Sequence, residues 1–193
     1  MTRDTMRGST SYVPFTSTNA RLDFRFLYPA DWQARETAGE GYDEVFILGP
    51  RNEESTYSAA LVARVSRLHS PATIETLAET VVQRRQGTSG FRLISQTRGA
   101  LEGVPAVETE ITYTIPLPIR SVRAQPTPVM ERRIILKRTD RLYELIYGAA
   151  ASDYHRFLEA FRTAVRTFVF REEGEEWGRR PLLAFGASPA ASA

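Results

Sequence analysis

The stretch FRFLYPADWQARE, from Phe24 to Glu36, places a Tyr-Pro pair and a tryptophan around a very short turn. The alternating apolar residues at its start are Leu22, Phe24, Phe26 and Tyr28. This alternation predicts a half-buried strand over residues 21–28. Pro29 ends that strand, because proline cannot donate a ladder hydrogen bond. The polar–apolar run from Trp32 to Glu36 then predicts the returning strand of a hairpin.

Further along the chain, strand and helix patterns follow one another in a definite order. Strands are predicted at residues 44–48, 57–68, 91–97, 104–115, 129–138 and 141–147. The apolar period changes to that of a helix after residue 73 and again from residue 152 to residue 170. Ser70 or Thr73 can cap the first helix, and Ser152 and Asp153 the second. The order predicts an α+β fold in which two long helices pack on an antiparallel sheet. All strand connections are short enough for antiparallel pairing except the proline-rich one.

The chain divides into three segments by composition. Residues 1–19 are polar and are expected to be mobile. Residues 20–170 carry the strand and helix patterns and are expected to form a single domain. Residues 171–193 begin with a charged run and end in Ala, Ser and Pro, a composition typical of a disordered tail. Within the tail, Trp177, Leu182, Leu183 and Phe185 could form a short docking segment, although self-packing or disorder is the preferred interpretation.

Composition argues against several classes of function. The chain has no cysteine, so disulfides, thiolate nucleophiles and thiolate metal sites are excluded. The formal charge is only +2 and the cations are interleaved with acids, so no nucleic-acid partner is expected. No apolar run reaches the ~20 residues of a membrane span. The N-terminus resembles no secretory signal, which predicts a cytoplasmic protein as written, or an extracytoplasmic one if a leader has been removed.

Catalytic and metal-binding patterns are weak. His69 and His155, the two histidines, are not spaced to bind a metal together. The sequence has no phosphate-binding glycine loop and no G-x-S-x-G nucleophile turn. Four acids could form an oxygen-ligand site for Ca²⁺ or Mn²⁺, although solvated carboxylates are the better interpretation: Asp23, Glu40, Asp43 and Glu44. We therefore predict no enzyme activity, no cofactor and no metal.

The segment PLPIRSVRAQPTP, from Pro116 to Pro128, is the most informative candidate for binding. Its four prolines reduce the entropy cost of presenting a loop, and long ordered loops are often functional. The side chains expected to contact a partner are Leu117, Ile119, Arg120, Val122 and Arg123. A variable insertion without any partner is an equally good interpretation of this pattern.

Four segments together resemble the PsbP-like superfamily, which includes PsbP, Mog, DcrB and LpqN-type domains. They are LYPADW (residues 27–32), LEGVPAVE (101–108), RLYELIYGA (141–149) and the final helix (152–170). The resemblance covers roughly residues 21–170. It implies an antiparallel sheet and two long helices in an α/β/α sandwich. The residues Tyr28, Pro29 and Trp32 are then a structural motif that locks the first strand and covers the sheet edge, with no binding role.

The resemblance also implies a non-catalytic accessory domain, of a kind that is often exported or attached to a membrane. We therefore expect a module that binds a protein partner, with peripheral membrane association. The alternatives are a carrier for a small ligand or for Ca²⁺ or Mn²⁺, and an extrinsic protein associated with a photosystem. An uncharacterised enzyme is the least favoured interpretation.

Overall fold

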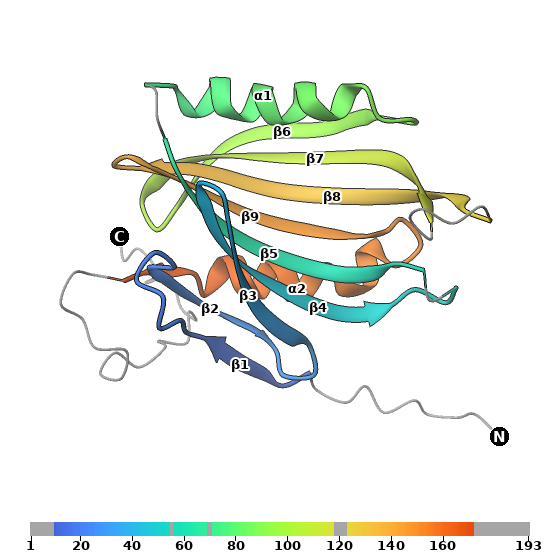
Figure 1. Ribbon diagram of the computed structural model, residues 1–193, viewed down its shortest axis with the longest axis horizontal. Coiled ribbons are helices and arrows are strands. Elements are labelled where there is room, and N and C mark those ends of the chain that lie inside the picture. Colours follow the sequence, from blue (N-terminus) through green and yellow to red (C-terminus); the bar gives the residue numbers. More distant parts are fainter. Residues whose placement is uncertain (1–9, 55, 69–70, 118–122, 172–193) are drawn as a thin grey trace, which may run out of the picture.

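The computed structural model describes residues 10–54, 56–68, 71–117 and 123–171 (Figure 1). Its helices are α1 (Ile74–Gln86) and α2 (Tyr154–Arg166). Its strands are β1 (Tyr12–Phe15), β2 (Phe24–Pro29), β3 (Gln33–Gly39), β4 (Tyr42–Arg51), β5 (Ser58–Arg67), β6 (Arg92–Leu101), β7 (Val104–Leu117), β8 (Gln125–Arg138), β9 (Arg141–Ala150) and β10 (Val169–Phe170). The α+β class predicted from the sequence is confirmed.

The strands form two antiparallel sheets. The larger one has the order β3-β4-β5-β9-β8-β7-β6, and the smaller one has the order β1-β2-β10. The hairpin predicted from Phe24 to Glu36 is therefore wrong, because β2 pairs with β1 and β10 whereas β3 pairs with β4. The link between Pro29 and Gln33 crosses from one sheet to the other. Alternation in a sequence specifies which face of a strand is buried, but it does not name the neighbouring strand.

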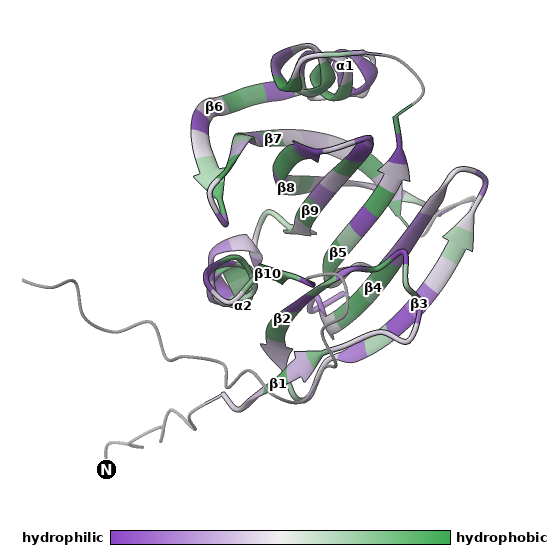
Figure 2. Ribbon diagram, turned by 90° about the vertical axis from the view of Figure 1, so that its left-hand side faces the viewer, coloured by the Kyte–Doolittle hydropathy of each residue, from purple (hydrophilic) through white to green (hydrophobic). Residues whose placement is uncertain are grey.

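The two helices lie on opposite faces of the seven-stranded sheet (Figure 2). Helix α2 and the small sheet cover one face, where they bury the main core. Large side chains of this core include Phe24, Phe26, Tyr147, Phe161 and Phe168. On the other face, α1 contacts β7 and β8 and buries a smaller cluster around Ala78, Val107 and Ile135.

Each helix has 13 residues, and the final one is shorter than the predicted range of residues 152–170. Helix α1 begins after Thr73, whose Oγ1 accepts a hydrogen bond from the backbone N–H of Thr76 at 3.2 Å, and ends at Gly87. Helix α2 ends at Arg166, and the next residues turn back so that Phe168 stacks on Phe24 and β10 pairs with β2. In the sequence, the apolar spacing of a helix continues through these residues, because their apolar side chains face the same core as those of α2. None of the described helices is long and apolar enough to cross a membrane.

Two connections also differ from the prediction. Tyr12–Phe15, in the segment expected to be mobile, form β1 and place Phe15 in the core; residues 1–9 of that segment lie outside the described residues. The proline-rich connection joins β7 to β8 as an antiparallel pair, in which Leu117 lies opposite Gln125. It is therefore the tip of a long hairpin.

A buried tyrosine ties the large sheet to the segment that precedes β2. The Tyr143 hydroxyl donates to the Asp23 carboxylate, with oxygen distances of 3.0 and 3.1 Å, and Arg141 forms an ion pair with the same carboxylate at 3.2 Å. Burial, together with the negative charge of Asp23, raises the pKa of Tyr143 from 10.0 to about 12.

This pKa shift predicts that the protein loses stability in alkali. A tyrosine whose pKa is higher in the folded state stabilises the fold fully below pH 10 and loses that contribution as the pH rises toward 12. We expect the free energy of unfolding, measured by urea denaturation, to fall between pH 10 and 12. Tyr143→Phe, which has no proton to lose, should be less stable at pH 8 but should show a flatter decline; an unchanged slope would contradict the assignment.

Candidate binding surface

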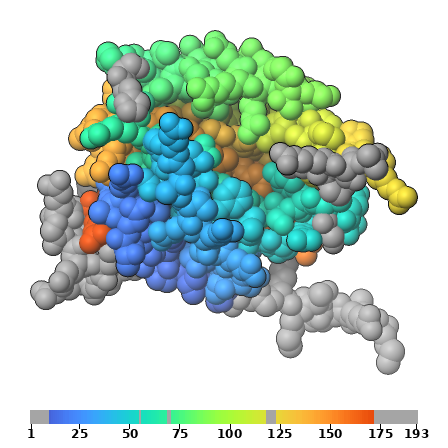
Figure 3. All heavy atoms as spheres, viewed as in Figure 1, coloured from blue at the N-terminus to red at the C-terminus, as the bar shows by residue number. Residues whose placement is uncertain are grey.

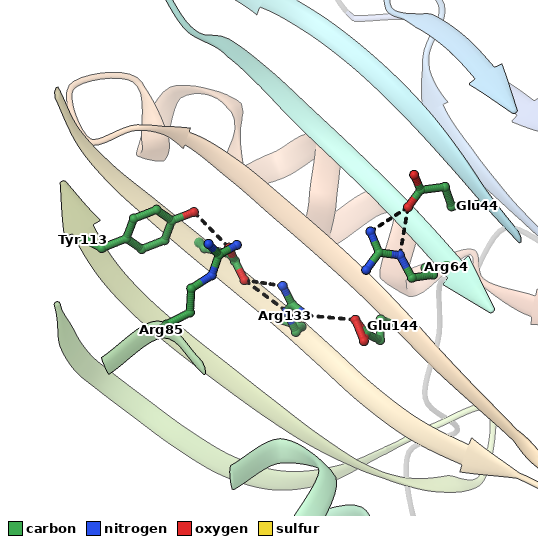
Figure 4. Close-up of polar contacts among 7 residues, drawn as sticks. Glu44, Arg64, Arg85, Tyr113, Arg133 and Glu144 are labelled. Carbon is green, nitrogen blue, oxygen red and sulfur yellow. Dashed lines mark hydrogen bonds and ion pairs between the residues drawn. The ribbon is translucent and has the colours of Figure 1, made fainter. Parts of the chain in front are cut away.

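A row of charged side chains crosses the α1 face of the large sheet (Figure 4). Its members come from four strands and one helix, and they are Glu44 of β4, Arg64 of β5, Glu144 of β9, Glu131 and Arg133 of β8, and Arg85 of α1. The antiparallel register brings these strands' residues side by side, because Arg64 lies opposite both Glu44 and Glu144. We call this set the charged row.

The geometry within the charged row is tight. Both Nε and Nη2 of Arg64 lie 2.8 Å from Glu44 Oε2. Arg133 donates to Glu144 at 2.8 Å and, through Nε and Nη2, to Glu131 at 3.0 and 2.7 Å. Arg85 reaches the second oxygen of Glu131 at 3.3 Å. Three arginines thus neutralise three carboxylates within the row.

Burial explains why these charges must be paired. Glu131, Arg133 and Glu144 are all buried, and an unpaired charge at such a position would be very unfavourable. The Tyr113 hydroxyl also donates to Glu131, at 3.1 Å. Burial and the charge of Glu131 raise the pKa of Tyr113 well above its usual range. Tyr113 therefore stays protonated at neutral pH, and the arginines keep their protons as well. Since the charges of the row do not change near neutral pH, the row is suited to holding the strands in position.

Beside the charged row, part of the same face is open. Phe46, Leu48, Val62 and Ile146 lie on this face, on strands β4, β5 and β9, whereas the main contacts of α1 are with β7 and β8. Leu48 is 42% exposed. Figure 3 shows a hollow between α1 and the β3–β4 hairpin, with atoms of β8 and β9 at its floor.

A pocket of about 510 Å³ opens at the end of the sheet where the β7–β8 connection lies. Three connections line it: β4–β5, β7–β8, and β9–α2. The first of these is shaped by Asn52, whose Oδ1 accepts hydrogen bonds from the backbone N–H groups of Thr56 and Tyr57 at 2.8 and 2.9 Å. We call it the loop-end pocket.

The predicted binding loop forms part of this pocket. Leu117 and Arg123 line it, Leu117 being buried and Arg123 exposed. Ile119, Arg120 and Val122 lie outside the described residues. The contributions of Asn52 and of the β9–α2 connection were missed at the sequence level, because residues this distant in sequence meet only when the strands pair.

A second pocket of similar volume lies around the β8–β9 turn at the opposite end of the sheet. It is lined by charged pairs, such as Arg21 with Asp43 at 3.4 Å and Arg67 with Asp140 at 3.4 Å. The third arginine of the lining, Arg141, pairs with Asp23, which is not itself a lining residue, so each of the three arginines has an acidic partner.

The four acids considered for Ca²⁺ or Mn²⁺ are separated by the fold. Asp23 pairs with Arg141, and Asp43 accepts hydrogen bonds from Asn19 and Arg21. Glu44 points to the other face of β4, toward Arg64, and Glu40 is exposed in the β3–β4 turn. In the described part of the chain, no group of three or more metal-ligating side chains is brought together.

His155 and the Tyr-Pro-Trp motif occupy ordinary structural positions. His155 lies in the first turn of α2 with its ring against Tyr154, and His69 lies outside the described residues. Trp32 is buried with its ring edge-on to Phe157, at a centroid distance of 6.1 Å. Its backbone N–H donates to the carbonyl of Pro29 at 3.0 Å, which closes the turn between the sheets.

Solved structures share this arrangement of strands and helices. LpqN of Mycobacterium tuberculosis, described as involved in cell envelope biogenesis, superposes with a TM-score of 0.57 at 12% identity, over 86% of this chain and 93% of its own. The cyanobacterial PsbP of Synechocystis sp. PCC 6803 gives 0.52 at 17% identity, over 86% and 95%. The Ran-binding protein Mog1p of Saccharomyces cerevisiae gives 0.54 at 9% identity, over 84% and 96%.

The protein has the PsbP/Mog1-like fold. The resemblance inferred from the four sequence segments is thereby confirmed at the level of fold. No family model matches the sequence, and no curated protein matches it closely enough to count. At these identities the PsbP/Mog1-like likeness concerns architecture, so binding residues have to be argued from the chain itself.

Proposed function

We propose that this chain is a non-catalytic accessory domain that binds a protein partner at the loop-end pocket. The observation that carries the proposal is the meeting of three connections around a cavity of about 510 Å³, one of them the proline-rich hairpin tip. Binding residues concentrate on loops that a rigid sheet holds in place. The fold neighbours support this class of function, because Mog1p is described as Ran-binding.

The lining of the pocket suits a peptide or protein surface. Pro126 and Pro128 supply rigid apolar contacts, while Glu54 and Arg123 carry one charge of each sign. Proline-rich walls lose little conformational entropy when a partner is bound. A site at a membrane surface fits the same geometry, since the pocket opens at one end of the sheet.

The test compares partner capture by two redesigned turns of the same strand. Because Leu117 lies opposite Gln125, a two-residue Asn-Gly turn can replace residues 118–124 and close the hairpin without changing its register. The control replaces Thr139 and Asp140, at the other end of β8, with the same Asn-Gly pair. We expect crosslinking in native cell extract, followed by mass spectrometry, to capture a partner with wild type and control but not with the shortened hairpin. Equal capture by all three proteins would contradict the proposal.

A carrier for a small ligand or a metal ion is the second candidate, because about 510 Å³ is within the usual range for ligand pockets. A ligand that binds only the folded state increases the free energy of unfolding, by about 2.7 kcal/mol when its concentration is 100 times its Kd. The melting temperature rises as a result. If Ca²⁺, Mn²⁺ or a metabolite raises the melting temperature of wild type but not of the shortened hairpin, and no protein is captured, the carrier replaces the partner-binding proposal.

A further inference from the structure

Strand β6 forms one margin of the large sheet (Figure 2). Within the described residues, β6 pairs with β7 alone. Nine of its ten residues are exposed, and only Leu101 is buried. A strand edge of this length presents a row of unpaired N–H and C=O groups to any extended chain that approaches it.

Apolar exposure is concentrated on this edge. Three large hydrophobic side chains are exposed in the described part of the chain, and two of them are neighbours on β6, Leu93 at 44% and Ile94 at 50%. The opposite margin, β3, also pairs with a single strand within the described residues. Unlike β6, it has no exposed large hydrophobic residue. It carries Arg35 and Glu36 instead, so its own residues have no net charge to attract a charged strand. The two margins therefore differ in what they offer a partner.

Side-chain space adjoins β6 on the α2 face. Two hollows, of about 150 and 220 Å³, share Glu108, Ile134 and Val165 as lining residues. The smaller hollow is also lined by β6 residues from Thr97 to Leu101. A Cβ built on Gly99 meets no atom within 4 Å, so this part of the strand leaves room for neighbouring side chains. Small apolar groups of an added strand could enter this space.

Charge identifies the kind of occupant. β6 contains two cations, Arg92 and Arg98, and no acid. Arg98 points to the α1 face, where it reaches Glu75 at 3.3 Å while its side chain stays 78% exposed. A second copy of β6 would bring arginines together along one edge, whereas an acidic strand would be attracted to them. The pairing of β6 with β7 shifts register once, at Ile94, and the pairing from Ser95 to Leu101 is regular.

We propose that β6 accepts an extended acidic–apolar segment of another protein as an additional strand. The backbone edge supplies the hydrogen bonds, Arg98 faces acidic side chains on the α1 face, and the smaller hollow beside Val165 receives small apolar side chains on the α2 face. This is strand addition, in which main-chain bonds give affinity and alternate side chains give specificity. The proposal is independent of the loop-end pocket.

The first test uses an acetylated, fluorescein-labelled peptide of ten alternating glutamate and valine residues, with its lysine–valine analogue as the control. We expect fluorescence anisotropy to show binding of the glutamate peptide to the full chain, and at least about tenfold weaker binding of the lysine peptide. Arg98→Glu should reverse this preference, and Arg35→Glu on β3 should leave it unchanged. Absence of binding by the glutamate peptide, or equal binding by both peptides, would overturn the proposal.

The second test asks whether the contact runs through the backbone. Successive residues of a strand direct their N–H groups to opposite sides, so only one residue set of the peptide can bond to β6. Two N-methylated peptides are compared, one methylated at all glutamates and the other at all valines. We expect one of the two to lose binding and the other to keep it. Retained binding by both N-methylated peptides would refute strand addition.

A last comparison concerns the chain's own acidic tail. A protein ending at Arg171 should bind the glutamate peptide as the full chain does. If the peptide binds only after residues 172–193 are removed, the tail is the occupant of β6, and the proposal of a separate partner is overturned.

Discussion

Arg133→Leu is expected to lower the free energy of unfolding by about 3–5 kcal/mol. The substitution removes the guanidinium that bridges Glu131 and Glu144 in the charged row. Glu144 then loses its ion pair at a position where its side chain is only 8% exposed. Glu131 keeps Arg85 and Tyr113 as partners, so most of the loss should arise at Glu144.

The control for this prediction changes the buried charges together. Replacing Arg133 and both of its carboxylate partners with leucine removes the three buried charges together, and such replacements are often neutral or stabilising. The Tyr113 hydroxyl loses its acceptor in this variant, which sets a limit on the recovery. We expect urea unfolding followed by circular dichroism to show the triple variant to be more stable than Arg133→Leu. If the single variant costs less than about 1 kcal/mol, water reaches the row and the charges are not effectively buried.

Trp32→Ala is expected to cost about 3–5 kcal/mol, because it removes a large aromatic side chain from the core. The ring is 6% exposed, lies edge-on to Phe157, and covers Gly49. The contact with Gly49 is so close that a Cβ built there would lie 2.5 Å from the ring. Any side chain at residue 49 therefore has to displace the tryptophan.

This contact provides a double-mutant test. Gly49→Ala should destabilise wild type strongly but should cost much less in the Trp32→Ala background, where the space is vacant. Stability should be followed by far-UV circular dichroism, because Trp32 itself dominates any change in fluorescence from the core. Additive costs, or a loss below about 1 kcal/mol for Trp32→Ala, would place the ring at the surface.

Local patterns predicted individual elements well. The change to a helical apolar period after residue 73, with Thr73 as one of two possible caps, predicted where α1 begins. The strands predicted at residues 129–138 and 141–147 are also present, as β8 and β9. These features depend on neighbours within a few residues, which a sequence displays directly.

Features that depend on pairing between distant strands could not be predicted. Glu44, Arg64 and Glu144 each resemble a solvent-facing residue of an alternating strand, and only the register places them side by side. A signal was present in Glu131 and Arg133, which are two residues apart and therefore share a face. The open margin at β6 was equally hidden, because a strand becomes an edge only through the order of its neighbours.

The order of strands in the large sheet also bears on how the chain is synthesised. β5 lies between β4 and β9, and Arg67 pairs with Arg141. After β5 leaves the ribosome, roughly 70 further residues must emerge before β9 can pair with it, which takes about 4–14 s at 5–20 residues per second. During that interval the side of β5 that will pair with β9, at Leu61, Ala63 and Val65, has no permanent neighbour. Nascent chains stalled between α1 and β9 should therefore bind chaperones more strongly than chains released past Ala150.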